Sequence, residues 1–117
     1  MIIPCPTGEA YLPFQEAGVR LAFSRPHVLL ADDPGLGKTI QAIGLMNLDQ
    51  SIKRTLIICP AHIRINWQRE IKKWSVRPCQ IIIGIGRTPR CPPLEPDSIL
   101  IVNYDILKAW LPYLKEI

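Results

Sequence analysis

Gly35, Gly37, Lys38 and Thr39 form the group of residues in this sequence that is best suited to chemistry. The apolar run at residues 28–31 has the composition of a buried strand, and the residues after Thr39 have the spacing of a helix. Because glycine has no Cβ, backbone N–H groups converge there on phosphate oxygens, and the helix points its positive N-terminal end at the same anion. The group therefore predicts a nucleoside triphosphate site, with Lys38 on the β- and γ-phosphates and the Thr39 hydroxyl as a Mg²⁺ ligand.

This phosphate loop departs from the strict pattern G-x-x-x-x-G-K-[ST], which requires glycine at position 32, where Asp32 stands. Its place between a predicted strand and a predicted helix is the context that phosphate binding demands. The alternative is an ordinary glycine-rich turn before a Lys-Thr pair. Pro34 has no backbone N–H and cannot donate a hydrogen bond to phosphate. The predicted nucleotide-binding residues of the loop are Asp33, Pro34, Gly35, Leu36, Gly37, Lys38 and Thr39.

Gln15 is a second candidate for nucleotide binding. It lies in an amphipathic helix predicted at residues 11–24, which Pro26 ends. Pro13 suits the first turn of that helix, where its missing N–H is harmless. A side-chain amide both donates and accepts hydrogen bonds, so Gln15 could read the edge of an adenine ring. The alternative is an exposed helical glutamine without such a role.

Helices and strands alternate along the rest of the chain. Apolar runs predict strands at residues 55–59, 79–83 and 98–102, and helical spacing predicts helices at about residues 39–48, 63–74 and 106–114. The apolar face of the middle helix, which carries Trp67 and Trp74, is predicted to pack on the sheet. This order indicates an α/β fold with a mostly parallel sheet covered on both faces and a ligand at its carboxyl edge.

Composition limits the class of protein. The 117 residues suffice for one small domain, and 48% hydrophobic with 21% charged residues is typical of a globular chain. A net charge of +4 permits a polyanionic partner without identifying one. We expect a reduced, intracellular protein, because the sequence shows no signal peptide, no apolar run long enough for a membrane span and no C-x₂-C pair among its cysteines. The cysteines are Cys5, Cys59, Cys79 and Cys91.

Four stretches, in order, resemble motifs of the SWI/SNF-type DNA translocases of helicase superfamily two. Leu12-Pro13-Phe14-Gln15 is similar to the adenine-reading Q-type motif. The stretch from Ala31 to Gln41 resembles motif I, in which an acidic pair precedes Gly-Leu-Gly-Lys-Thr, so that Asp32 is the expected variant. The form of this motif is closest to annealing-helicase-like or phage-encoded members of the family.

The other two motifs lie further along the chain. Cys59-Pro60-Ala61, followed by Asn66-Trp67 and Glu70, resembles motif Ia, which borders the DNA path. Ile101-Val102-Asn103-Tyr104-Asp105 is similar to motif Ib, which carries Ser or Asn before Tyr-Asp.

This resemblance implies a P-loop NTPase (RecA-like) three-layer fold and ATP-dependent translocation on duplex DNA. In that setting Gln15 reads adenine, Lys38 neutralises phosphate charge and Thr39 holds Mg²⁺. The resemblance also implies that His62, Asn66 and Tyr104 lie towards the DNA backbone as nucleic-acid contacts. The expected cofactors are ATP and Mg²⁺, and the expected partner is duplex DNA, with no membrane. The location expected from the family is the nucleus in a eukaryote and the cytoplasm in a bacterium or phage.

The family's acidic D-E-x-H box, its second lobe and the arginine finger of that lobe do not occur in the 117 residues. We therefore expect an irregular segment at residues 1–10 and the N-terminal portion of the first helicase lobe at residues 11–117, incomplete as a fold. Hydrolysis needs a water-positioning group and a transition-state cation besides a phosphate cradle, so no complete catalytic set is expected and the chain alone is not expected to hydrolyse ATP. The alternatives are a stand-alone, non-catalytic nucleotide-binding or interaction module and an unrelated phosphate-loop enzyme such as a small kinase.

Overall fold

The computed structural model of the protein describes residues 2–27 and 38–116. The chain forms two compact units, of which the first comprises Met1–Ser51 with Arg69–Arg77 and the second Ile52–Gln68 with Pro78–Ile117. The strand predicted at residues 28–31 lies outside the described residues. So do the loop residues Asp33, Pro34, Gly35, Leu36 and Gly37.

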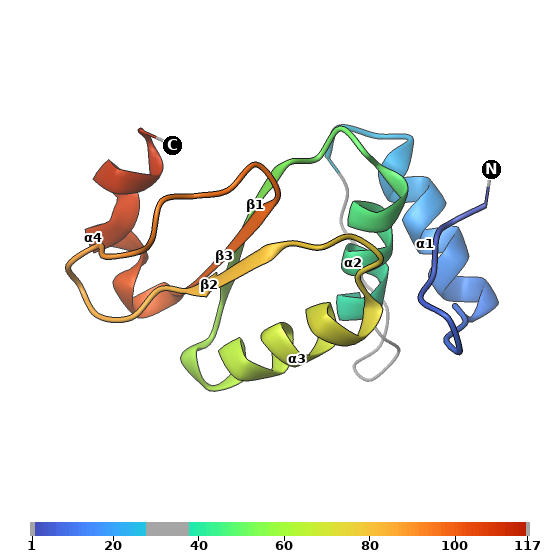
Figure 1. Ribbon diagram of the computed structural model, residues 1–117, viewed down its shortest axis with the longest axis horizontal. Coiled ribbons are helices and arrows are strands. Elements are labelled where there is room, and N and C mark those ends of the chain that lie inside the picture. The colour runs from blue at the N-terminus through green and yellow to red at the C-terminus, as the bar shows by residue number, and fades with distance from the viewer. Residues whose placement is uncertain (1, 28–37, 117) are drawn as a thin grey trace. The chain divides into compact units, whose positions relative to one another are not determined.

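The first unit contains two helices packed against each other, α1 (Pro13–Phe23) and α2 (Lys38–Leu48) (Figure 1). Both were predicted from their apolar spacing. Pro13 begins α1, where proline costs no intrahelical hydrogen bond. Val19 from α1, Leu48 from α2 and Ile3 from the N-terminal segment form one buried apolar cluster, and Tyr11 packs against it.

The second unit contains a parallel sheet, which confirms the predicted α/β class. Its described strands are β1 (Arg54–Cys59), β2 (Gln80–Ile83) and β3 (Ser98–Asn103), in the order β1-β3-β2 (Figure 1). β3 lies between the other two and is buried along its whole length, as expected of the central strand of an α/β sheet.

Three helical segments follow the strands of this sheet. A short 3₁₀ helix, η1 (Ala61–Ile63), and α3 (Arg64–Trp74) follow β1, and α4 (Tyr104–Leu114) follows β3 directly. Residues 64–68 of α3 belong to the second unit and residues 69–74 to the first.

Helix α4 covers one face of β3. Ile106 and Trp110 of α4 form a buried cluster with Leu100 and Val102 of β3. Trp110 is fully buried, and its indole Nε1 donates a hydrogen bond of 2.8 Å to the carbonyl oxygen of Gly86, a residue with a φ of +76° that favours glycine. Among the described residues, none of the helices is long and apolar enough to cross a membrane.

Candidate functional site

Lys38 and Thr39 lie in the first described turn of α2. Lys38 is exposed and Thr39 is half-buried, and neither side chain makes a hydrogen bond or an ion pair within the described part of the chain. Most of the remaining residues of α2, including Ile43 and Leu48, are buried and hold the helix in the first unit. An ammonium group and a hydroxyl are thus available together at this end of the helix, as Mg²⁺–triphosphate binding requires.

Gln15 lies at the other nucleotide-binding position predicted from the sequence. Only 4% of its surface is exposed, so the alternative of an exposed helical glutamine is wrong. Its Oε1 accepts a hydrogen bond of 2.9 Å from the backbone N–H of Leu12, the residue just before α1. This bond gives the backbone N–H of Leu12 a partner and holds the side-chain amide of Gln15 at the start of the helix.

The three residues proposed to face DNA follow the carboxyl ends of the strands. Cys59, the last residue of β1, pairs with Asn103, the last residue of β3, so both strands end at the same edge of the sheet. His62 follows β1 by three residues, Asn66 lies in the first turns of α3, and Tyr104 follows Asn103 directly. All three are exposed, Tyr104 by 61%.

Arg64, between His62 and Asn66 in the sequence, is a residue that the sequence analysis missed. Its Nε donates to the carbonyl oxygen of Ala61 at 3.0 Å, and its Nη1 donates to the carbonyl oxygen of Gly84 at 3.3 Å and to Oδ1 of Asn103 at 3.4 Å. The sequence held one indication of this role. A positive charge at the first residue of a helix is unfavourable to the helix dipole, so its presence there suggests another interaction that stabilises it.

The Arg64 charge acts on a neighbouring thiol. Burial raises the pKa of the Cys59 thiol above its ordinary value of 9.0, and the positive charge of Arg64 lowers it by a smaller amount. The thiol form of Cys59 is therefore favoured, and this residue acts as a buried apolar group at the strand end.

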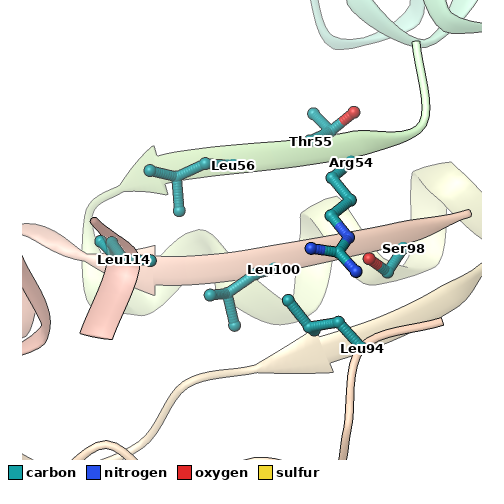
Figure 2. Close-up of a pocket in the computed structure, with 7 residues that line it drawn as sticks. All are labelled: Arg54, Thr55, Leu56, Leu94, Ser98, Leu100 and Leu114. Atoms are coloured by element: carbon teal, nitrogen blue, oxygen red, sulfur yellow. The ribbon is translucent and has the colours of Figure 1, made fainter. Parts of the chain in front are cut away.

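A pocket of about 190 Å³ opens on the same unit but near the other ends of the strands (Figure 2). Arg54 and Ser98, the first residues of β1 and β3, are register partners and line it. Leu56 and Leu100 extend its wall along the strands, and Leu114 closes it from α4 (Figure 2). The pocket lies away from the edge that carries His62 and Tyr104 and contains none of the predicted site residues.

Comparison with known protein families defines the class. Residues 14–110 match the model of the SNF2-related domain, a range that includes parts of both units and the four motifs except for Leu12 and Pro13 of the first. The chain belongs to this SNF2-related family.

Individual relatives agree. The chain is 38% identical over 104 residues to the SWI/SNF-related matrix-associated actin-dependent regulator of chromatin subfamily A-like protein 1 of Xenopus tropicalis. The aligned region covers 86% of this chain and 11% of the relative. The chain is 44% identical over 101 residues to the human DNA annealing helicase and endonuclease ZRANB3. This aligned region covers 84% of this chain and 9% of the relative. The chain thus spans about a tenth of the length of these relatives.

Proposed function

We propose that this chain is the ATP-binding part of a SWI/SNF-type DNA translocase. The observation that carries the proposal is the pairing of Lys38 and Thr39, both available at the start of α2, in a chain of the SNF2-related family. Lys38 would hold the β- and γ-phosphates, Thr39 would hold Mg²⁺, and Gln15 would read adenine. The bound metal would supply charge neutralisation on the phosphates.

The same proposal assigns the exposed carboxyl edge of the sheet to duplex DNA. His62, Asn66 and Tyr104 carry imidazole, amide and phenol groups, all of which hydrogen-bond phosphate or sugar oxygens. Their exposure and their shared edge support this role. The relatives named as a DNA annealing helicase and as a chromatin regulator make duplex DNA the natural first ligand to test.

The proposal includes no hydrolysis by the 117 residues alone. The cradle binds and orients the triphosphate, but the sequence holds no D-E-x-H box to position the attacking water.

Titration with a fluorescent ATP analogue, with and without Mg²⁺, tests nucleotide binding. We expect Lys38→Ala to weaken binding by roughly tenfold or more, since it removes a charge-assisted contact. Lys72→Ala, which removes an exposed lysine from α3, should leave affinity unchanged. Thr39→Val should abolish the gain from Mg²⁺ while Thr39→Ser keeps it.

An assay of phosphate release with and without duplex DNA completes the experiment. Binding without release supports the proposal. Release stimulated by DNA would overturn the non-catalytic part, and equal affinity in Lys38→Ala and the unaltered chain would overturn the nucleotide site. Nucleotide binding with no DNA binding would favour the alternative of a stand-alone nucleotide-binding module.

A further inference from the structure

The Arg64 side chain contacts two segments that are distant from it in the sequence. Its guanidinium donates locally to Ala61, which lies two residues after the end of β1, and also to Gly84, which follows β2, and to Asn103, the last residue of β3. Gly84 and Asn103 are buried, which excludes water as an easy substitute partner. Arginine suits this place because its donors are fixed in one planar fork.

Asn103 gives up another contact to accept this bond. It is the N-cap residue of α4, and asparagine at this position normally accepts a hydrogen bond from the backbone N–H groups of the first helical turn. Its side chain makes no such bond here, and Oδ1 instead accepts from Arg64. The first turn of α4, which begins with the exposed Tyr104, is therefore held through the arginine.

The loop after β2 is held at the same point. The Gly84 N–H donates to Ile101 of β3 at 2.8 Å while its carbonyl oxygen accepts from Arg64. Trp110 fixes the next turn through Gly86. The strand ends thus form one connected frame with Arg64 among them.

We propose that Arg64 is the positioning residue of the DNA-facing edge, holding His62, Asn66 and Tyr104 in one arrangement by tying together the carboxyl ends of β1, β2 and β3. The ligand in this inference, duplex DNA, rests on the proposed function. The role of Arg64 rests on its hydrogen bonds. Arg64 acts through geometry rather than through its charge, so a lysine at this position, which keeps the charge but not the fork, does not replace it.

Two measurements on the 117-residue chain test this. The first is amide hydrogen exchange by NMR, which needs no ligand. In Arg64→Lys we expect exchange at Gly84, whose N–H donates to the carbonyl oxygen of Ile101, to rise on the order of tenfold, as loss of a charge-assisted bond implies, with Ile57 in the strand interior unchanged. Arg69→Lys, an exposed arginine on the same helix, should leave both amides as they are.

The second measurement is affinity for a short DNA duplex by fluorescence anisotropy, over a range of salt concentrations. Arg64→Lys and Arg64→Met should lose affinity about equally, on the order of tenfold, and Arg64→Lys should keep the salt dependence of the unaltered chain because its charge is retained. Asn103→Ala, which removes only the acceptor, should raise exchange at Gly84 as well. In the double variant, Asn103→Ala should raise this exchange little beyond the effect of Arg64→Lys alone.

Each outcome decides the question. Full affinity and unchanged exchange in Arg64→Lys would overturn the inference and leave charge as the only role of the residue. Raised exchange with full affinity would make Arg64 a purely structural residue. If the unaltered chain binds no duplex, the proposed function fails, whereas the exchange result still decides whether Arg64 ties the strand ends.

Discussion

Asn47 lies in the last turn of α2 and is almost completely buried, with 1% of its surface exposed. Its Nδ2 donates to the carbonyl oxygen of Trp74 at 2.8 Å and to the hydroxyl of Tyr11 at 3.0 Å, and its Oδ1 accepts from the backbone N–H of Val76 at 3.0 Å. The Tyr11 hydroxyl in turn donates to Pro4 at 2.7 Å. This one amide joins the N-terminal segment, α2 and the end of α3 within the first unit.

Replacing Asn47 by leucine should lower the free energy of unfolding by about 2–4 kcal/mol, because the buried carbonyl of Trp74 and N–H of Val76 lose their partners. Urea unfolding followed by circular dichroism measures this. Asn66→Leu, at an exposed position on α3, serves as the control and should change stability by no more than about 0.5 kcal/mol. Unfolding of Asn47→Leu at the urea concentration of the unaltered chain would contradict the role of the amide.

Tyr11 gives the first unit a pH dependence. Burial raises the pKa of its hydroxyl above the ordinary value of 10.0, and the hydrogen bond with Asn47 lowers it by less. Since the pKa is higher in the folded chain than in the unfolded one, the neutral hydroxyl stabilises the fold fully below pH 10.0, and this contribution is lost as the pH rises through the folded-state pKa.

We therefore expect Tyr11→Phe to be less stable than the unaltered chain at neutral pH, by about 0.5–1.5 kcal/mol, but to lose less stability as the pH is raised above 10.0. Tyr113, whose pKa is raised by its hydrogen bond with Cys91, titrates in both proteins and does not affect the comparison. Urea unfolding at a series of alkaline pH values gives the two slopes. Parallel slopes would show that Tyr11 is not the titrating group.

Neither Asn47 nor Arg64 could be predicted from the sequence as a connecting residue. Asn47 bonds to Tyr11 across 36 positions, and Arg64 bonds to Asn103 across 39. Periodicity says which side of a helix is buried but not which distant carbonyl a side chain reaches. The phosphate-loop residues could be proposed from the sequence because their chemistry is local: glycine, lysine and threonine act within a few consecutive positions.

At the scale of the elements, the first unit depends on a close approach of α1 and α2. An added Cβ on Gly18 of α1 would overlap Oε1 of Gln41, a side chain that is 1% exposed. On α2, an added Cβ on Gly44 would lie 2.8 Å from Cγ2 of Val19. Glycine on each helix therefore sets the distance at which their apolar faces meet.

Gly18→Ala should destabilise the chain by about 1–3 kcal/mol through this overlap, against a gain of up to about 1 kcal/mol in helix propensity. In a Gln41→Ala background the obstacle is gone, so the same substitution should become neutral or stabilising. Urea unfolding of the four proteins of this double-mutant cycle measures the coupling. Equal effects of Gly18→Ala in both backgrounds would contradict direct packing of Gln41 on Gly18.

The described helices and strands match the predicted ones closely, with shifts at their ends. Apolar runs identified β1, β2 and β3, and Asn103 extends β3 by one residue because it still pairs with Cys59. The 3₁₀ helix Ala61–Ile63 was not separated from α3, since three residues carry too little periodicity. The expectation that Trp74 packs on the sheet was wrong: its ring stacks on Tyr11 of the first unit with centroids 5.6 Å apart, because the last part of α3 belongs to that unit.

At the scale of the whole molecule, the apolar surface that remains exposed is informative. β1 is an edge strand of the described sheet, and its alternate residues Leu56 and Ile58 are 44% and 39% exposed on one face. An exposed, apolar edge strand is a template for pairing with another chain. The relatives have further sequence with which to cover such a face, because this chain matches only 9–11% of their length.

We therefore expect the purified 117-residue chain to self-associate as its concentration rises, measured by sedimentation velocity. Ile58→Lys places a charge on this face and should shift the chain towards monomer without loss of stability, because the position is already partly exposed. Leu111→Lys adds the same charge at a position on α4 that is 40% exposed and should leave self-association unchanged. A strictly monomeric unaltered chain, or equal effects of the two lysines, would mean that the β1 face does not drive association and that the sheet is stable with this edge open.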